Sequence, residues 1–249
     1  QPCCAVQMPE QVDGIRMRLD KYLCELNLGT RSQVKKDIKA GLVSVNGVLV
    51  LRPEEQVQAE EDSISYKGQP CIYEGYVYYL LHKPAGVVSA TRDRQARTVL
   101  DLIVDKTRKD LFPVGRLDKD TEGLLLITND GALAHELLAP NRHVEKEYEC
   151  HLTRPFDGKQ RQMLEQGVDI GEKKPLEPAV VQILEDKKIT LTITEGKFHQ
   201  VKRMLHAVGN EVVYLKRIRM GPLVLEETLP RGAFRRLTKE EVESLKYDR

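Results

Sequence analysis

The hydrophobic pattern near the start of the chain predicts a small helical module followed by a β-hairpin. A first helix is predicted from four apolar residues at helical spacing, which are Leu19, Tyr22, Leu23 and Leu26. Thr30 and Gln33 match a capping box for a second helix, which ends at Gly41. The Asn-Gly pair at 46–47 stands between two alternating β-branched runs, which is a strong signal for a two-residue hairpin.

From Tyr76 onward the pattern changes to short apolar, β-rich runs separated by Gly and Pro turns. The expected strands lie within VYYLLHKPAGVVSA, GLLLITNDG, KEYECHLTR, KKITLTITEG and EVVYLKRIRMGPLVL. Helices are expected over residues 132–138, 159–166, 199–208 and 238–245, the last with Thr238 and Glu241 as a capping box. Because no regular βαβ rhythm occurs, we expect an α+β fold with a mixed, mainly antiparallel sheet and flanking helices.

These patterns predict four segments. We expect a flexible lead-in over residues 1–16, a small domain over 17–62, a linker over 63–75 and a larger domain over 76–249. The linker is inferred from the acidic and polar composition of residues 54–75, which also contain Gly68 and Pro70.

Composition narrows the class of protein. Of the 249 residues, 41% are hydrophobic, which is enough for the core of one or two domains. No apolar run is long enough to cross a bilayer, and the first residues lack the features of a secretory signal. The five cysteines form no Cys-x-x-Cys pair, which argues against disulfides and structural zinc. We therefore expect a cytoplasmic protein, and a monomer, since no heptad pattern occurs.

Charge is nearly balanced overall, with a formal net charge of +1, but it is unevenly distributed. Lysines and arginines outnumber acids over residues 16–47 and again over 197–219. On the second predicted helix, Lys35, Lys36 and Lys39 lie close enough to repel one another. A solvated surface would explain these basic blocks, and so would a bound phosphate backbone.

The stretch GRLDKDTEGLLLITNDG, residues 115–131, crowds four acids around an apolar run. Asp118 follows a glycine turn and directly precedes the predicted strand, so its carboxylate would be rigidly placed beside buried residues. Such a group suits nucleophilic or acid–base chemistry, although an ordinary Asx-turn explains the same pattern. Asp130, before Gly131, fits a turn and the start of a helix.

The stretch EGKFHQVKRML, residues 195–205, predicts a short helix with a charged flank. Its buried face is given by four residues at helical spacing, which are Val201, Met204, Leu205 and Val208. Lys202 and Arg203 flank that face, where they could remain in solvent, pair with a catalytic carboxylate or bind a phosphate. His199 could begin the helix or contact a base. A metal role is not indicated, because the histidines lack metal-ligand spacing.

Tyr148 lies in KEYEC, where it alternates with charged neighbours as a strand residue does. Its ring could belong to the core or serve as a platform for a base turned out of its helix.

Taken together, these motifs resemble those of a known family. GRLDKDTEGLLLITNDG resembles the signature of the RsuA-type rRNA pseudouridine synthases. MRLDKYLCELNLGTRSQVKKDIKAGLVSVNG resembles an S4 RNA-binding domain, which is an αL-like module. LHKPAGVVSA, KEYEC and EGKFHQVKRMLHAVGNEV resemble, in order, the early strand and turn and the second and third catalytic motifs of the family. The motif HQVKRM resembles the corresponding motif of members that act on 16S rRNA more closely than that of members that act on large-subunit rRNA.

The resemblance implies roles residue by residue. Asp118 matches the essential aspartate, Tyr148 the tyrosine that stacks on the target base, and Lys202 the basic partner of the aspartate. Arg203 is an alternative partner, since it is adjacent. Arg116 matches the arginine that helps hold the target nucleotide out of its helix. The full set of expected RNA-binding residues is Arg116, Arg18, Arg31, Lys35, Lys36, His199, Gln200 and Arg203.

The implied activity is isomerisation of a specific uridine of ribosomal RNA, with 16S rRNA favoured, to pseudouridine. No cofactor or metal is expected, and the expected partner is ribosomal RNA or a pre-ribosomal subunit, without a membrane. Three alternatives remain open at this point. They are a non-catalytic RNA-binding ribosome-assembly factor, a large-subunit 23S rRNA pseudouridine synthase, and a hydrolase using Asp118 with Asp120 or Glu122.

Overall fold

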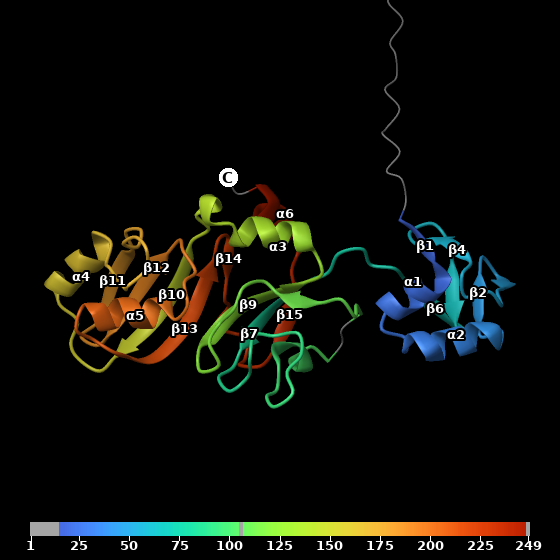
Figure 1. Cartoon of the computed structure of the whole chain (residues 1–249), viewed down its shortest axis with the longest axis horizontal. Helices are drawn as coiled ribbons and strands as arrows, with labels where there is room; N and C mark the ends of the chain where they lie inside the picture. Colours follow the sequence, from blue (N-terminus) through green and yellow to red (C-terminus); the bar gives the residue numbers. More distant parts are fainter. Residues whose placement is uncertain (1–14, 105–106, 248–249) are drawn as a thin grey trace, which may run out of the picture. The chain divides into compact units, whose positions relative to one another are not determined.

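The computed structural model describes residues 15–104 and 107–247, which divide into two compact units (Figure 1). The N-terminal unit holds the described residues up to Gly75 together with residues 107–110, and the C-terminal unit holds the rest. The expected lead-in over residues 1–16 lies outside the described residues, except for Ile15 and Arg16. Within the described residues, no helix has the length and apolar character required to cross a membrane.

The N-terminal unit packs two helices against short strands. Its elements are β1 (Arg16–Arg18), α1 (Leu19–Glu25), α2 (Arg31–Lys39), β2 (Val43–Val45), β3 (Val48–Leu49), β4 (Gln56–Gln58), β5 (Ile64–Tyr66) and β6 (Gln69–Cys71). Thr30 accepts a hydrogen bond from the Gln33 N–H and so begins α2. The predicted hairpin at 46–47 is confirmed, because β2 and β3 pair across it and both turn residues have positive φ.

Residues 63–75, expected as a linker, instead carry β5 and β6. These strands continue the sheet in the order β3-β2-β5-β6, and Ile64 and Tyr66 point into the core of the unit. The turn between them is Lys67-Gly68, where both residues have positive φ. A lysine at the first position of such a turn is uncommon, so the polar sequence pattern did not predict the hairpin.

Residues 107–110 belong to the N-terminal unit, although residues 76–104 before them and 111–247 after them belong to the C-terminal unit. Arg108 is only 3% exposed, and its guanidinium lies 3.1 Å from Glu25 and 2.9 Å from Asp110. It also donates to the Glu74 carbonyl and stacks over the Tyr73 ring. A segment that is distant in sequence therefore completes the surface of this unit.

The C-terminal unit is built on one mixed sheet of nine strands. Its strands are β7 (Tyr78–Lys83), β8 (Phe112–Pro113), β9 (Glu122–Thr128), β10 (Lys146–Leu152), β11 (Val180–Glu185), β12 (Lys188–Ile193), β13 (Val212–Met220), β14 (Leu223–Val224) and β15 (Phe234–Arg236). The main order is β11-β12-β10-β13-β9-β7-β15, with β14 beside β13 and β8 beside β9. Only the β13–β9 pair is parallel, which confirms the predicted mixed, mainly antiparallel α+β fold.

Helices cover both faces of this sheet (Figure 1). They are η1 (Val99–Leu102), α3 (Gly131–Leu138), η2 (Pro140–Arg142), α4 (Gly158–Glu165), α5 (Gln200–Ala207) and α6 (Lys239–Tyr247). One core contains the buried side chains of α4 and α5, and a second core contains those of α3 and α6. Successive residues of β9 alternate between these cores, which explains why its sequence is apolar without a break.

The predicted helices agree with the structure to within two residues at each end, and Thr238 and Glu241 form the predicted capping box before α6. β11 was not predicted from the sequence. It is the edge strand of the sheet, and Val181 is its only buried residue, so its pattern lacks the alternation that marks a half-buried strand.

Candidate active site

Asp118 lies in the loop between β8 and β9, and the backbone on both sides of it is fixed. Leu117 is buried in the α4–α5 core, while the Ser89 hydroxyl accepts from the Leu117 N–H and donates to its carbonyl. On the other side, the Thr121 N–H donates to the Asp118 carbonyl at 3.0 Å. The carboxylate of Asp118 therefore projects from an anchored turn, and its side chain stays 26% exposed.

A fully buried lysine lies beneath this loop. The Lys83 ammonium donates to the carbonyls of Thr121 at 2.7 Å, Pro84 at 3.0 Å and Lys119 at 3.3 Å. Burial lowers the pKa of Lys83 to about 8, although the nearby carboxylates of Asp120 and Asp118 oppose that shift. At neutral pH the lysine remains charged and holds the carbonyls that flank Asp120.

Helix α5 brings a second lysine to the loop. Val201, Met204 and Leu205 bury one side of the helix, which leaves Lys202 on the side that faces Asp118. The Lys202 Nζ lies 3.0 Å from Asp118 Oδ2 and 2.7 Å from Asp120 Oδ1. His199, just before the helix, places its Nε2 3.5 Å from Asp118 Oδ1. Residues about eighty positions apart thus form one cluster of charges.

The cluster favours the charged forms of Lys202 and Asp120. Partial burial disfavours the charge of Lys202, but hydrogen bonds to Asp120 and Asp118 raise its pKa above the usual value. The hydrogen bond from Lys202 likewise lowers the pKa of Asp120. A lysine ammonium shared by two carboxylates is stable as a charged group, and here it stabilises the carboxylate form of Asp120.

Tyr148 lies on β10, opposite Leu191 of β12 and Arg217 of β13. It is 8% exposed and belongs to the same hydrophobic core as Leu117 and Val201. Those two residues are the sequence neighbours of Asp118 and Lys202. One continuous core therefore positions the three elements that carry Asp118, Tyr148 and Lys202.

The other predicted site residues of this unit have different surroundings. Arg116 is exposed beside Asp118. Arg203 points away from Asp118 and binds Glu172 at 2.8 Å and the Ile170 carbonyl at 2.6 Å, so Lys202 is the partner that the structure provides. Gln200 is 4% exposed, and its side-chain oxygen accepts from the Lys197 N–H. The expected RNA contact of Gln200 is thus corrected to a buried role in closing this turn.

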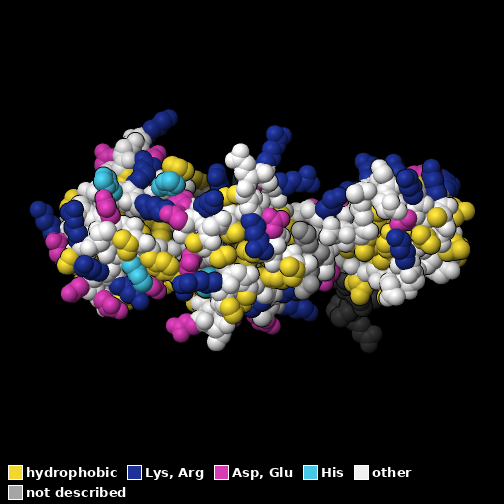
Figure 2. Space-filling view, turned by 90° about the horizontal axis from the view of Figure 1, so that it is seen from below, with side chains coloured by type: hydrophobic (Ala, Val, Ile, Leu, Met, Phe, Trp, Pro, Cys, Tyr) yellow, Lys and Arg dark blue, Asp and Glu magenta, His cyan; other side chains and the backbone are white. Residues whose placement is uncertain are grey.

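In the N-terminal unit, four predicted RNA-binding residues fall into two groups. Arg18 and Lys35 both contact Asp20, a fully buried carboxylate, at 2.8 and 3.9 Å. Arg31 and Lys36 are exposed on α2. On the face that Figure 2 shows, lysine and arginine side chains are spread over both units rather than gathered in one field.

Sequence patterns missed part of the site. Ser89 and Lys83 lie in LHKPAGVVSA, whose resemblance to the family gave a location but no role. The bridging position of Asp120 depends on where α5 packs, which no local pattern reveals. Asp130 caps α3 by accepting from the Leu133 N–H, as predicted. Among the described residues, no group of three or more His, Cys, Asp or Glu side chains is arranged to hold a metal.

Comparison with known proteins gives consistent matches. A model of the RNA pseudouridylate synthase family matches residues 77–207, and a model of the S4 domain matches residues 17–64. An uncharacterized RNA pseudouridine synthase of Bacillus subtilis (strain 168) is 46% identical over 234 residues, covering 92% of this chain and 98% of that protein. Ribosomal small subunit pseudouridine synthase A of Escherichia coli (strain K12) is 37% identical over 231 residues, covering 92% and 100%. The crystal structure of a pseudouridylate synthase, 38% identical, matches with a TM-score of 0.66 over 92% of this chain and 99% of the other.

Proposed function

The chain belongs to the RNA pseudouridylate synthase family and is an RNA pseudouridine synthase with an S4 domain, and we propose that it isomerises one uridine of small-subunit ribosomal RNA with Asp118 as the reacting carboxylate. The observation that carries this proposal is the 3.0 Å pair between Lys202 and Asp118 on an anchored loop. The small-subunit substrate is supported by the names of several relatives at 37–40% identity.

The reaction breaks the N1–C1′ bond of uridine and joins C5 to C1′. N1 gains a proton and C5 loses one, so no electron donor, acceptor or group donor is required. Asp118 would attack C1′ or C6, or remove the C2′ proton after the glycosidic bond breaks. Each of these routes needs an ionised carboxylate, and the ammonium of Lys202 lies 3.0 Å from that of Asp118.

The target base has to leave its helix before Asp118 can reach it. Tyr148 would stack against the turned-out uracil, and Arg116, exposed beside Asp118, would help hold the nucleotide out. Exposed cations of the S4 domain would hold the surrounding RNA through its phosphates. Because the proposed substrate is ribosomal RNA, we infer that the protein acts in the cytoplasm.

Release of tritium tests this proposal, because rejoining through C5 displaces the hydrogen at that position. Small- and large-subunit rRNA labelled with [5-³H]uridine would be incubated separately with the full chain. We expect release from small-subunit rRNA that reaches about one equivalent per molecule. Release from large-subunit rRNA alone would overturn the small-subunit assignment, and release from neither RNA, naked or partly assembled, would overturn the activity.

A further inference from the structure

Phe198 is an exposed aromatic ring beside the proposed catalytic cluster. Its side chain is 73% exposed, although a phenylalanine in water leaves a large apolar area uncovered. One face of the ring stacks on His199, with centroids 3.7 Å apart and planes 20° from parallel. The other face is open to solvent.

His199 links this ring to Asp118. His199, on which it stacks, lies within 3.5 Å of Asp118 and has a left-handed backbone with φ of 49°. Arg203 donates to the Phe198 carbonyl at 3.1 Å. A non-glycine residue held at positive φ beside a reactive group is typical of a functional constraint.

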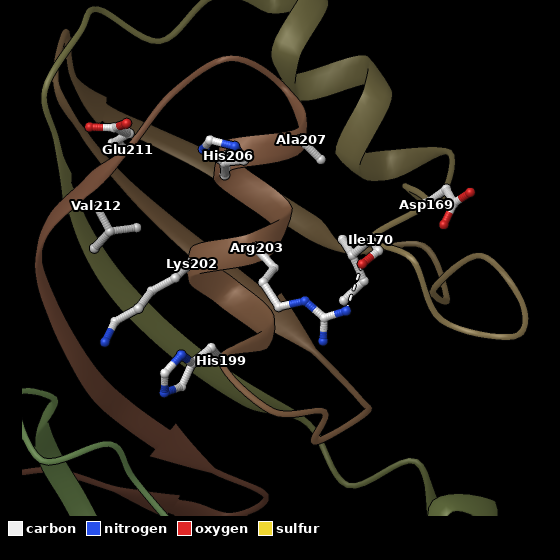
Figure 3. Close-up of a pocket in the computed structure, with 9 residues that line it drawn as sticks. All are labelled: Asp169, Ile170, His199, Lys202, Arg203, His206, Ala207, Glu211 and Val212. Carbon is white, nitrogen blue, oxygen red and sulfur yellow. Dashed lines mark hydrogen bonds between the residues drawn. The ribbon is translucent and has the colours of Figure 1, made fainter.

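A hollow of about 640 Å³ lies beside His199 on the outer side of α5 (Figure 3). His199, Lys202, Arg203 and His206 line it at positions i, i+3, i+4 and i+7 of the helical repeat. Ile170 and Val212 add apolar surface to its walls, and Asp169 and Glu211 add two carboxylates. Figure 3 shows His199 and Lys202 at the same end of the hollow, next to each other.

An exposed aromatic ring beside a hollow with cationic, polar and apolar walls matches the chemistry of one nucleotide. A base stacks on an aromatic ring, and its sugar-phosphate lies against cationic and apolar side chains. Turning the target uridine out of its helix leaves adjacent nucleotides without their stacking partner. His199 contacts both the Phe198 ring, at 3.7 Å between centroids, and Asp118, at 3.5 Å, so a base stacked on Phe198 would be close to the nucleotide held at Asp118.

We propose that Phe198 and the hollow along α5 form a subsite for an unpaired RNA nucleotide next to the target uridine. Phe198 stacks the base of this nucleotide, and the side of α5 that carries His206 receives its sugar-phosphate. This subsite rests on the proposed function, since it takes Asp118 as the reacting group. Because bases differ in how strongly they stack, the subsite would favour certain bases next to the target uridine.

Kinetics of the full chain with small-subunit rRNA test the subsite. Phe198→Ala should raise KM by about five- to a hundredfold, the range for losing one base–aromatic stack, and leave kcat within about twofold. Phe198→Tyr should keep the wild-type KM, because it retains the ring. The matched control is Tyr247→Ala, which removes a ring that is 72% exposed on α6 and should change neither constant.

A binding measurement separates the subsite from turnover. The chain has no tryptophan, so Phe198→Trp introduces a single indole whose fluorescence reports stacking. The probe is a single-stranded RNA hexamer with one internal uridine flanked on both sides by adenosines, compared with the same hexamer made abasic at the two flanking positions. We expect strong quenching by the intact hexamer, little by the abasic one, and none in a Tyr247→Trp control.

The outcomes distinguish the two proposals. Quenching that requires the flanking bases supports the subsite, even if rRNA turnover is absent and the proposed function fails. Turnover by the wild type, with an unchanged KM for Phe198→Ala and no quenching, overturns the subsite and leaves the proposed function. Absence of both turnover and quenching overturns both.

Discussion

Lys202 lies between two carboxylates, and its position distinguishes the roles of Asp118 and Asp120. Asp118 is 26% exposed and held by the anchored backbone around Leu117, whereas Asp120 is 73% exposed. The hydrogen bond from Lys202 lowers the pKa of Asp120, so Asp120 is not the protonated acid that a carboxylate-pair hydrolase would need beside Asp118. The arrangement favours Asp118 as the reacting group and Asp120 as a helper that keeps Lys202 in place.

This division of roles predicts different effects of two matched substitutions. Asp118→Asn should reduce turnover by at least about a thousandfold, because it removes the reacting group. Asp120→Asn should reduce it only about fivefold, since Lys202 keeps its contact with Asp118. Tritium release from rRNA measures both, with RNA binding and thermal unfolding as controls for intact structure. Equal losses for the two variants would contradict the assignment.

Buried lysines predict how stability depends on pH. Burial lowers the pKa of Lys83 and of Lys146 to about 8, against roughly 10.4 in the unfolded chain. Between these values the unfolded chain binds more protons at these two lysines than the folded chain does, so their contribution to the free energy of unfolding should rise with pH from about 8 to 10.4, whereas the buried thiol of Cys150, whose pKa burial raises, contributes a fall. Urea unfolding at pH 7.5 and 9.5 measures the net change, and Lys146→Met should make that change less positive by about 2 kcal/mol. An identical pH dependence in the variant would contradict the burial of a charged Lys146.

Local sequence predicted the reactive residues better than the residues that position them. Asp118 and Lys202 were found through motifs, and the structure brings them into contact. The contact of Asp120 with the same lysine, and the place of Phe198 beside the loop, both depend on how α5 packs against the sheet. Gln200 was misassigned because a polar residue in a basic segment gives no sign that its amide is buried.

At the scale of elements, the backbones of β9 and β13 approach closely at their junction in the C-terminal unit. These strands form its one parallel pair, and Gly123 stands opposite Arg217. Gly123 has φ of 112°, and a Cβ there would collide with the Arg217 backbone. Since β9 directly follows the loop that carries Asp118, this close approach fixes the distance between that loop and the sheet.

The junction predicts that Gly123→Ala is severely destabilising. The added methyl group would push β13 away from β9 and force an unfavourable backbone conformation, for an expected loss of about 3 kcal/mol or more. Gly131→Ala at the start of α3 is the control, because its Cβ meets no atom within 4 Å, and it should leave stability unchanged or slightly higher. Thermal unfolding of the two variants measures the difference, and equal melting temperatures would contradict it.

The elements predicted best were those with a regular pattern or a strong turn signal. The Asn46-Gly47 hairpin and the Thr238 capping box were found directly. β5 and β6 were missed because Lys67-Gly68 is a weaker turn signal within acidic sequence, and β11 because an exposed edge strand shows little alternation. The order of strands in the sheet was not predictable, since it is set by pairings between distant segments.

At the scale of the whole molecule, we propose that the S4 domain supplies RNA affinity and the C-terminal unit supplies the reaction. Two of the predicted RNA-binding cations of the S4 domain, Arg18 and Lys35, contact the buried Asp20, so they also hold the domain together. Arg31 and Lys36 are exposed on α2 and are free to face phosphates. The exposed pair therefore gives the cleaner test of RNA binding.

Removing this pair should weaken RNA binding without affecting catalysis. Arg31→Ala with Lys36→Ala should reduce affinity for rRNA about tenfold and lower the salt slope by about two, while kcat at saturating RNA stays unchanged. Arg52→Ala, an exposed arginine of the same unit outside α2, is the control and should bind like the wild type. Filter binding over a range of salt concentrations measures both quantities. Unchanged affinity and slope would mean that α2 does not face the RNA.

The most direct test of the whole account is pseudouridine mapping, base by base, on ribosomal RNA treated with the wild type and with Asp118→Asn. We predict a single new pseudouridine in small-subunit rRNA with the wild type and none with the variant. The same pseudouridine formed by Asp118→Asn would contradict the role of Asp118, and a new site only in large-subunit rRNA would contradict the proposed substrate.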